Sequence, residues 1–424
     1  MIWVGLALLI LALFGTPLFA IIAAGALLGF YSEEIDLAVV AIEIYRLSEM
    51  PILLAIPLFT FAGYLLGESH APSRLVRLTN TFIGWLPGGL PIVAIVTSAL
   101  FTAFTGASGV TIVALGALLY PALTQAGYPD RFNLGLVTTS GSLGLLFAPA
   151  LPLILYAVVA QQMNLEQAMG VDEMFLAGIF PGLLMLFLLG AWSMTQPRKI
   201  MRINPVVTGK EMREALLDAA WELPLPFVVL GGIYSGYFAI SEAAAVTALY
   251  VLLIEIIIRR DIPLKHLPAV MRQSMVLVGG ILIILSVSLP STNYMIDTEV
   301  PARLFETIRQ YIDGQLTFLI ALNIFLLLVG MFLDIFSALV ILVPIMLPVA
   351  VAYGVHPVHF GIIFLANMQL GYLTPPLGMN LFIASYRFEK PVMEIYQSVI
   401  PFIGILLIAV LVITYWPALS LSLL

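Results

Sequence analysis

Small polar residues and glycines gather at four points of an otherwise apolar sequence, and their oxygen atoms have the chemistry of cation ligands. The first half of the chain contributes Thr105, Gly106, Ser108, Ser140, Gly141 and Ser142. The second half contributes Gly330, Asp334, Ser337, Gly371, Thr374 and Gly378. Hydroxyl and carbonyl oxygens suit a hard cation such as Na⁺. The pattern predicts a Na⁺ site in each half, and so two or more bound ions.

The same points offer groups that suit an anionic small molecule. Amides at a helix N-terminus carry partial positive charge and favour an anion. The candidate substrate-binding residues are Ser108, Gly144, Pro149, Asn367, Thr374 and Pro375. The alternative is that these small residues only pack helices together, because Ser, Thr and Gly are enriched where membrane helices meet.

Asp334 is an ionisable residue inside an apolar segment, which by default indicates a functional site. Its structural alternative is an N-cap, with the carboxylate accepting from the amides near Phe336 and Ser337. The two roles are compatible. We expect a cap that also shapes the ion site.

Glycines and prolines break the two halves at the same spacing, which defines the elements that hold these residues. Four positions recur 227 residues later, as the pairs Pro121/Pro348, Gly127/Gly354, Gly144/Gly371 and Pro149/Pro376. Glycine and proline interrupt helices for backbone reasons that an apolar composition does not impose at fixed intervals. Interrupted segments in corresponding halves are typical of the binding site of a secondary transporter.

The composition places the chain in a membrane. It has 424 residues, of which 62% are hydrophobic and 10% charged, with a mean hydropathy of +1.10. A soluble domain is about a quarter charged. Apolar stretches such as 174–194, 241–258 and 391–418 are long enough for spanning helices, which need about 20 residues. The sequence predicts an all-α polytopic membrane protein in contact with the lipid bilayer.

Several kinds of chemistry are not indicated. The chain has no cysteine and therefore no disulfide or thiolate ligand. No nucleophile–base pair and no phosphate-binding loop stands out, and no basic patch suggests nucleic acid. We therefore expect neither an enzyme nor a cofactor.

Basic residues predict the orientation, because loops rich in Lys and Arg stay in the cytoplasm. The two densest groups consist of Arg198, Lys199, Arg202, Lys210 and Arg213, and of Arg259, Arg260, Lys265 and Arg272. Counting spans outward from them puts the N-terminus in the cytoplasm and the C-terminus in the periplasm.

Two regions, 90–126 and 316–353, each contain two apolar arms that are short for a span and enclose a polar turn. We interpret them as re-entrant hairpins, since exposed backbone at membrane depth is tolerated only inside protein or beside water. Four ordinary helices are the alternative. With hairpins, an odd number of crossings separates the two copies, which predicts an inverted repeat.

This interpretation divides the chain into five parts. Residues 1–89 form scaffold helices with an interfacial helix, and residues 90–162 form a first transport repeat made of the hairpin 90–126 and a broken helix, 131–162. Residues 163–315 form further scaffold helices with a cytoplasmic amphipathic segment at 199–220. Residues 316–387 form the second repeat, made of the hairpin 316–353 and a broken helix, 358–387. Residues 388–424 form a C-terminal helix.

Five stretches resemble the large membrane subunit of the tripartite ATP-independent periplasmic (TRAP) transporters, a family that includes C4-dicarboxylate and sialic acid systems. They are AIPLFTFAGYLL at 55–66, LPGGLPIVAIVTSALFTAFTGASG at 86–109, SEAAAVTALYVLL at 241–253, GMFLDIFSALVILVPIMLPV at 330–349 and GYLTPPLGMNLFIAS at 371–385. One departure is the segment 147–150, Phe-Ala-Pro-Ala, where the family usually has Pro-Pro-Ser.

The resemblance implies a subunit of the bacterial inner membrane that imports a small organic anion by an elevator mechanism coupled to Na⁺. It also implies two partners, a small membrane (Q) subunit and a periplasmic substrate-binding protein. A channel is the alternative function, because re-entrant hairpins also build selectivity filters. Inverted repeats within one chain favour alternating access.

Overall fold

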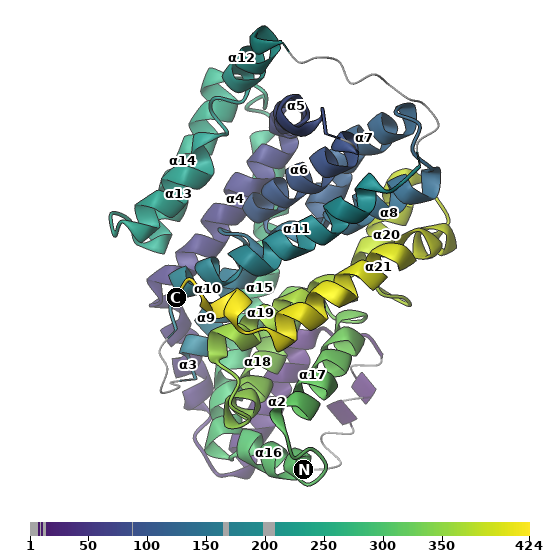
Figure 1. The fold of residues 1–424 in the computed structure, drawn as a ribbon. Helices are drawn as coiled ribbons and strands as arrows, with labels where there is room; N and C mark the ends of the chain where they lie inside the picture. Colours follow the sequence, from purple (N-terminus) through teal and green to yellow (C-terminus); the bar gives the residue numbers. More distant parts are fainter. Residues whose placement is uncertain (1–6, 9, 12–13, 87, 164–168, 198–207) are drawn as a thin grey trace.

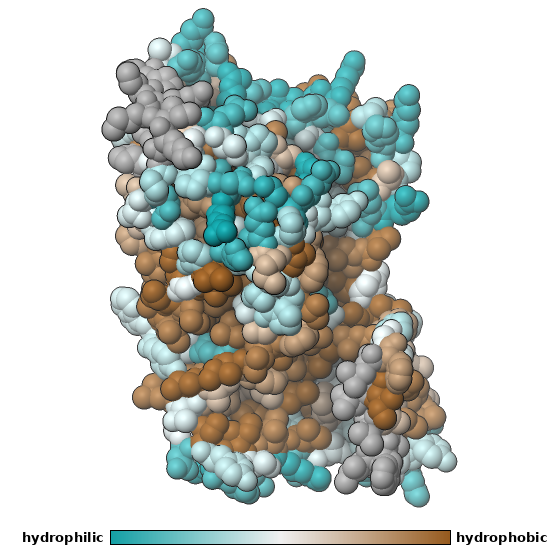
Figure 2. Space-filling view, turned by 90° about the vertical axis from the view of Figure 1, so that its right-hand side faces the viewer, coloured by the Kyte–Doolittle hydropathy of each residue, from teal (hydrophilic) through white to brown (hydrophobic). Residues whose placement is uncertain are grey.

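The protein is described by a computed structural model that covers residues 7–8, 10–11, 14–86, 88–163, 169–197 and 208–424. Within these residues every regular element is a helix, which confirms the predicted all-α fold (Figure 1). In the described part of the chain, seven helices are long and apolar enough to cross a membrane, or eight if a bent pair counts as one span. Figure 2 shows a broad hydrophobic band between two hydrophilic ends, as expected for a polytopic membrane protein.

The two repeats have the same order of elements. The first consists of the hairpin α6 (Gly89–Thr105) and α7 (Ser108–Gln125), followed by α8 (Asp130–Ser140), η2 (Leu143–Leu146) and α9 (Leu151–Gln161). The second consists of the hairpin α17 (Gln315–Gly330) and α18 (Ile335–Ala352), followed by α19 (Pro357–Gly371) and α20 (Met379–Phe388). The helix breaks fall where the sequence predicts them, near 140–150 and 371–378.

The remaining helices surround the repeats. Before the first repeat lie α2 (Leu18–Ser32), α3 (Ala38–Ser48), η1 (Pro51–Leu54), α4 (Ala55–Glu68) and α5 (Ala71–Ile83). Between the repeats lie α10 (Val171–Ala177), α11 (Ile179–Met194), α12 (Gly209–Asp218), α13 (Pro224–Tyr234), α14 (Ile240–Leu252), η3 (Leu253–Ile258), α15 (Leu267–Asp297) and α16 (Val300–Arg309). The chain continues with α21 (Val392–Tyr415) and α22 (Ala418–Leu421).

The amphipathic segments also form helices. The predicted interfacial helix is α5, and part of the segment 199–220 is α12; residues 199–207 lie outside the described part of the chain. Figure 1 shows α5 and α16, each of which precedes a hairpin, at opposite ends of the molecule. This placement agrees with an inverted repeat whose hairpins start from opposite ends. Re-entry of the hairpins within a membrane stays a prediction.

The four recurring Gly/Pro pairs have equivalent places in the two repeats. Pro121 lies inside α7 and Pro348 inside α18. Gly127 and Gly354 follow these helices with φ values of 85° and 81°, a left-handed conformation that favours glycine. The pair Pro149/Pro376 lies in the two helix breaks, and each of these prolines follows a cis peptide bond.

Close backbone contact joins each hairpin to its broken helix. A Cβ atom placed on Gly371 would lie 2.5 Å from the Cα of Gly330. The corresponding positions of the first repeat, 227 residues earlier, are Gly144 and Ala103, and a Cβ on Gly144 would lie 2.6 Å from the amide nitrogen of Ala103. The same glycine therefore lets the same two helices meet in both repeats.

A buried ion cluster fixes α5 to the helices beside it. The Arg74 guanidinium donates to Glu222 at 2.6 Å and to Asp261 at 2.7 Å, and it lies 3.3 Å from both carboxylate oxygens of Glu255. Burial raises the pKa of Asp261, but hydrogen bonds from Arg74 and from the His70 amide lower it more, so the pKa lies below its ordinary value. The cluster holds α5 against the residues before α13, against η3 and against the residues that follow η3.

Substitution of Gly371 by Ala should destabilise the protein, because the new methyl group would overlap the backbone of Gly330. Overpacking of this kind costs about 1–3 kcal/mol. The matched control is Gly280→Ala in α15, where a Cβ would meet nothing within 4 Å in the described chain. Thermal unfolding of the purified variants measures the difference. Equal unfolding temperatures for the two variants would contradict the close approach.

Arg74→Ala should be strongly destabilising, because it leaves buried carboxylates without their cation, at a cost of about 3–5 kcal/mol. The charge-preserving Arg74→Lys should lose less stability.

The pH dependence of unfolding tests Asp261 in the same cluster. A carboxyl group with a lowered pKa stabilises the fold fully above its unfolded pKa, and this contribution is lost as the pH falls through the pKa of the folded state. Acidification should therefore lower the unfolding temperature of the wild type more than that of Asp261→Asn. Wild-type stability in Arg74→Ala would refute the role of the cluster.

Candidate functional site

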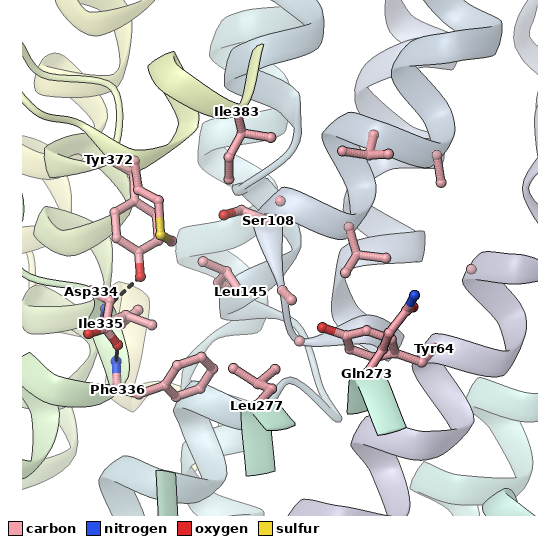
Figure 3. A pocket seen from close by; sticks show the side chains of 18 of the residues that line it. Tyr64, Ser108, Leu145, Gln273, Leu277, Asp334, Ile335, Phe336, Tyr372 and Ile383 are labelled. Carbon is pink, nitrogen blue, oxygen red and sulfur yellow. Dashed lines mark hydrogen bonds between the residues drawn. The ribbon is translucent and has the colours of Figure 1, made fainter. Parts of the chain in front are cut away.

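One cavity of about 930 Å³ brings the two hairpin tips together. The first tip contributes residues 106–110 and the second contributes residues 334–336. The opposite wall comes from α4, through Tyr64 and Glu68, and from α15, through Gln273 and Leu277. Figure 3 shows Ser108 and Leu145 between the side chains of the second tip on one side and Tyr64 and Gln273 on the other, with Leu277 next to Phe336. The cavity thus lies between the two repeats and the surrounding helices.

At the second tip the N-terminus of α18 is fully capped. The Asp334 carboxylate accepts from the amides of Phe336 and Ser337 at 3.0 and 3.1 Å, and also from the Ser337 hydroxyl at 2.5 Å. The amide of Ile335 donates to the hydroxyl of Tyr372 at 2.5 Å. The predicted capping role of Asp334 is confirmed. Because Asp334 also lines the cavity, its carboxylate faces both the helix and the site.

At the first tip hydroxyl groups join the hairpin to the broken helix. The Thr102 hydroxyl donates to the carbonyl oxygen of Gly141 at 2.9 Å, and the Ser140 hydroxyl donates to the hydroxyl oxygen of Ser98 at 3.2 Å. Thr105 is fully buried, and its hydroxyl finds no hydrogen-bond partner among the described residues. An orphaned hydroxyl beside the open carbonyl end of α6 has the chemistry of a cation ligand.

The second break forms a cradle of carbonyl oxygens around Gly378. A Cβ at this position would lie 2.6 Å from the carbonyl oxygen of Tyr372 and 2.9 Å from that of Thr374. Only glycine leaves this approach open. The Thr374 hydroxyl donates to the carbonyl oxygen of Leu370 at 2.8 Å. The carbonyl oxygens of Tyr372 and Thr374 accept from the amides of Asn380 and Gly378, both at 3.2 Å, so each has one lone pair left that suits a cation.

The predicted site residues divide into two groups. Gly106, Ser108 and Asp334 line the cavity. The others in the described chain belong to the tips and breaks without lining it: Thr105, Ser140, Gly141, Ser142, Gly144, Pro149, Gly330, Ser337, Gly371, Thr374, Pro375 and Gly378. Most of the predicted residues thus lie at the tips and breaks but do not line the cavity.

Asn367 has a different environment from the one expected of a substrate ligand. Its side chain is fully buried and donates to Asn323 at 2.7 Å, and Asn323 in turn accepts from Thr414 at 3.1 Å. These contacts join α17, α19 and α21. The structure therefore places Asn367 in an interhelical network and not on the cavity wall.

Sequence reasoning missed several polar residues of the site. The Ser108 hydroxyl donates to Asn380 at 2.7 Å, which joins the first hairpin to α20 of the second repeat. Tyr64, Gln273 and Tyr372 line the cavity. Tyr64, Tyr372 and Asn380 lie in stretches that carry the family resemblance. Gln273 is a single polar residue in an apolar helix and gives little signal.

An all-helical polytopic protein with two broken-helix repeats around one internal cavity belongs to the class of membrane transport proteins. The family model described as "Tripartite ATP-independent periplasmic transporter, DctM component" matches residues 3–419. The chain belongs to this family, the large permease component of the TRAP transporters.

Two relatives and one solved structure illustrate the similarity. The C4-dicarboxylate TRAP transporter large permease protein of Rhodobacter capsulatus is 33% identical over 93% of this chain and 91% of its own length. The isethionate TRAP transporter permease protein DctMQ of Oleidesulfovibrio alaskensis is 33% identical over 94% of this chain and 61% of its own length. The YdaH transporter of Alcanivorax borkumensis shares the fold, with a TM-score of 0.66, 14% identity, and coverage of 91% of this chain and 88% of that one. These relatives are transporter subunits and not enzymes.

Replacement of the Asp334 carboxylate tests its role as the cap of α18. Asp334→Ala removes the cap of α18, which costs about 1 kcal/mol, and should speed hydrogen exchange at the amides of Phe336 and Ser337. Asp334→Asn should largely preserve the cap, because Asn is an equally good N-cap residue. Hydrogen–deuterium exchange of the purified protein measures both effects. Unchanged exchange in Asp334→Ala would show that the cap contributes little to the hairpin.

Proposed function

We propose that this chain is the permease subunit of a TRAP system of the bacterial inner membrane that imports a small organic anion in symport with Na⁺. The observation that carries the proposal is a cavity of about 930 Å³ that is lined by both hairpin tips and by the scaffold helices α4 and α15. A site between two repeats and a scaffold suits alternating access, because moving one part against the other changes which side the site faces.

Na⁺ fits at the carbonyl ends of the broken elements. In the first repeat we assign it to the tip residues Thr105, Gly106 and Ser108 and to residues 140–142. In the second repeat we assign it to Gly330, Asp334 and Ser337, with the break residues Gly371, Thr374 and Gly378. The orphaned Thr105 hydroxyl and the carbonyl cradle around Gly378 support these two sites. Two or more ions would then bind together with the substrate.

An elevator mechanism requires the two repeats to move as one body, and contacts between them support this. Besides the bond between Ser108 and Asn380, the Tyr156 hydroxyl donates to the carbonyl oxygen of Pro357 at 2.6 Å. Just after the second repeat, the Lys390 ammonium lies 2.9 Å from the Asp130 carboxylate, which ties the segment that follows this repeat to α8, and this hydrogen bond raises the pKa of Lys390 above its ordinary value. We assign residues 90–162 and 316–387 to the moving domain. Residues 1–89 and 163–315 form the scaffold, on which the cluster around Arg74 lies.

The substrate class and the partners follow from the relatives. One relative is described as a transporter of C4-dicarboxylates and another of isethionate, and both substrates are organic anions. The second relative is described as DctMQ and is longer than the match to this chain, which supports a separate small membrane subunit here. We also propose a periplasmic binding protein that delivers the substrate, a cytoplasmic N-terminus and a periplasmic C-terminus.

Uptake by proteoliposomes tests the coupling. The vesicles contain this chain and the small subunit, and labelled succinate, N-acetylneuraminate or isethionate is supplied with the binding protein. An inward Na⁺ gradient should drive uptake of at least one of these anions. Substitution of Ser108, Ser337 or Thr374 by Ala should raise the Na⁺ concentration for half-maximal uptake by at least about 5-fold, since a hydrogen bond or ligand of this kind is worth about 1 kcal/mol.

The matched control is Ser286→Ala in α15, because that hydroxyl is exposed and only donates to Ile283 of its own helix at 2.8 Å. It should leave the Na⁺ dependence unchanged. Expression of all four variants should match the wild type. Uptake that does not respond to a Na⁺ gradient would disprove the coupling.

A further inference from the structure

The two hairpins differ at the point where their second helices begin. Ala107 is the N-cap of α7 and Asp334 is the N-cap of α18, and these positions are 227 residues apart, the spacing of the repeat. The backbone is in the extended region at both N-caps, with φ and ψ of −133° and 114° at Ala107 and −71° and 156° at Asp334. The two helices therefore start alike, but only α18 has a carboxylate there.

The second acceptor at α18 has no equivalent at α7 either. In the second repeat the Tyr372 hydroxyl accepts from the amide of Ile335. The residue 227 positions before Tyr372 is Leu145, whose side chain cannot accept a hydrogen bond. Leu145 lines the cavity next to Ser108 (Figure 3). Both groups that satisfy the N-terminus of α18 are thus replaced by apolar residues at α7.

The N-terminus of α7 consequently has main-chain amides that lack an acceptor in the described part of the chain. Residues 107–110 all line the cavity. Within the described part of the chain, their amides have no hydrogen-bond partner, and no side chain caps the helix. An 18-residue helix also concentrates partial positive charge at this end. Such an end favours a negatively charged group.

A buried side chain at the same place also lacks a partner. Asn380 is fully buried, and its Oδ1 atom accepts from the Ser108 hydroxyl. The Nδ2 atom of the same amide group has no hydrogen-bond partner among the described residues. A buried amide donor without an acceptor is unfavourable, and this Nδ2 atom belongs to the same amide group as the oxygen that accepts from Ser108. It is a second, independent sign of a missing acceptor at this end of α7.

We propose that the N-terminus of α7 binds the oxyanion group of the substrate, a carboxylate or a sulfonate, through the amides of residues 107–110. Asn380, on α20, is a positioning residue, because its Oδ1 atom accepts from the Ser108 hydroxyl and so holds the start of α7 in place. The end of α18 is not available for the same purpose, because Asp334 occupies it with a negative charge. This assignment rests on the proposed import of an organic anion and names the place where its charge is held.

The charges around the cavity agree with this assignment. None of the described residues that line it is Lys or Arg, and its acidic residues are Glu68 and Asp334. An anion therefore has no side-chain cation to bind there. The main-chain amides at the N-terminus of α7 are then the groups with partial positive charge that an anion in the cavity can bind. The anion would lie at the tip opposite Asp334, with Na⁺ balancing the carboxylate.

Ala107→Asp tests the proposal, because it gives α7 the same cap that α18 has. The new carboxylate should occupy the amides, slow their hydrogen exchange without ligand, and lower the affinity for the anion by at least about 10-fold through like-charge repulsion. Ala107→Asn is the control: it supplies a neutral cap of the same shape and should reduce the affinity much less. The purified complex of this chain with its small subunit is titrated in Na⁺ buffer with succinate, N-acetylneuraminate and isethionate.

Hydrogen exchange of the wild type gives a readout that needs no variant. The anion that binds should slow exchange at residues 108–110 and leave residues 336–337 unchanged. Binding of an anion that is equally tight in Ala107→Asp and protects no amide of α7 would overturn this site and leave Na⁺-coupled import standing. A wild-type protein that binds none of the three anions and takes none up would overturn the proposed function together with the site.

Discussion

The structure depends on how helix ends are satisfied away from water. Every helix leaves amides at its start and carbonyl groups at its end without intrahelical partners, and this chain places several such ends inside the molecule. Inside an apolar environment an unsatisfied group is costly. Each end must therefore be capped by a side chain, contact another element, or face a ligand. The N-terminus of α18 uses the first solution, through Asp334 and Tyr372.

The close backbone approach at Gly371 and Gly144 makes these solutions possible. Because the hairpin and the broken helix meet at backbone distance, their polar groups come within reach of each other, as Thr102 and Gly141 do in the first repeat. A larger side chain at either glycine would separate the two elements, and the polar groups at their helix ends would then face apolar surface. The hydrogen bonds between the two elements therefore depend on the two glycines.

The sequence predicted the parts of this arrangement that depend on local backbone chemistry. Paired glycines and prolines located both helix breaks, and Asp334 was identified as a cap because the capping residue is adjacent to the amides it accepts from. The contacts between distant segments were not predictable in this way. Asn380 meets Ser108 across 272 residues, and Arg74 meets Glu255 across 181. Hydropathy and spacing describe one helix at a time, and they do not determine which faces of two distant helices meet. For the same reason Asn367, polar and next to a break, was expected at the substrate and instead packs against Asn323.

The inverted repeat provides an internal comparison, because some equivalent positions have similar local structure and different side chains. Where repeats agree, as at Gly144 and Gly371, the residue serves the packing that both copies need. Where they differ, as at Ala107 and Asp334, packing does not explain the difference, since both N-caps have extended backbone. A carboxylate at one tip and an uncapped helix at the other give the cavity a negative end and a positive end. A symmetric site would hold a cation and an anion equally well at either tip. On the proposed assignment this asymmetry puts the cation at one tip and the anion at the other tip of the same cavity, so that neither charge would be buried alone.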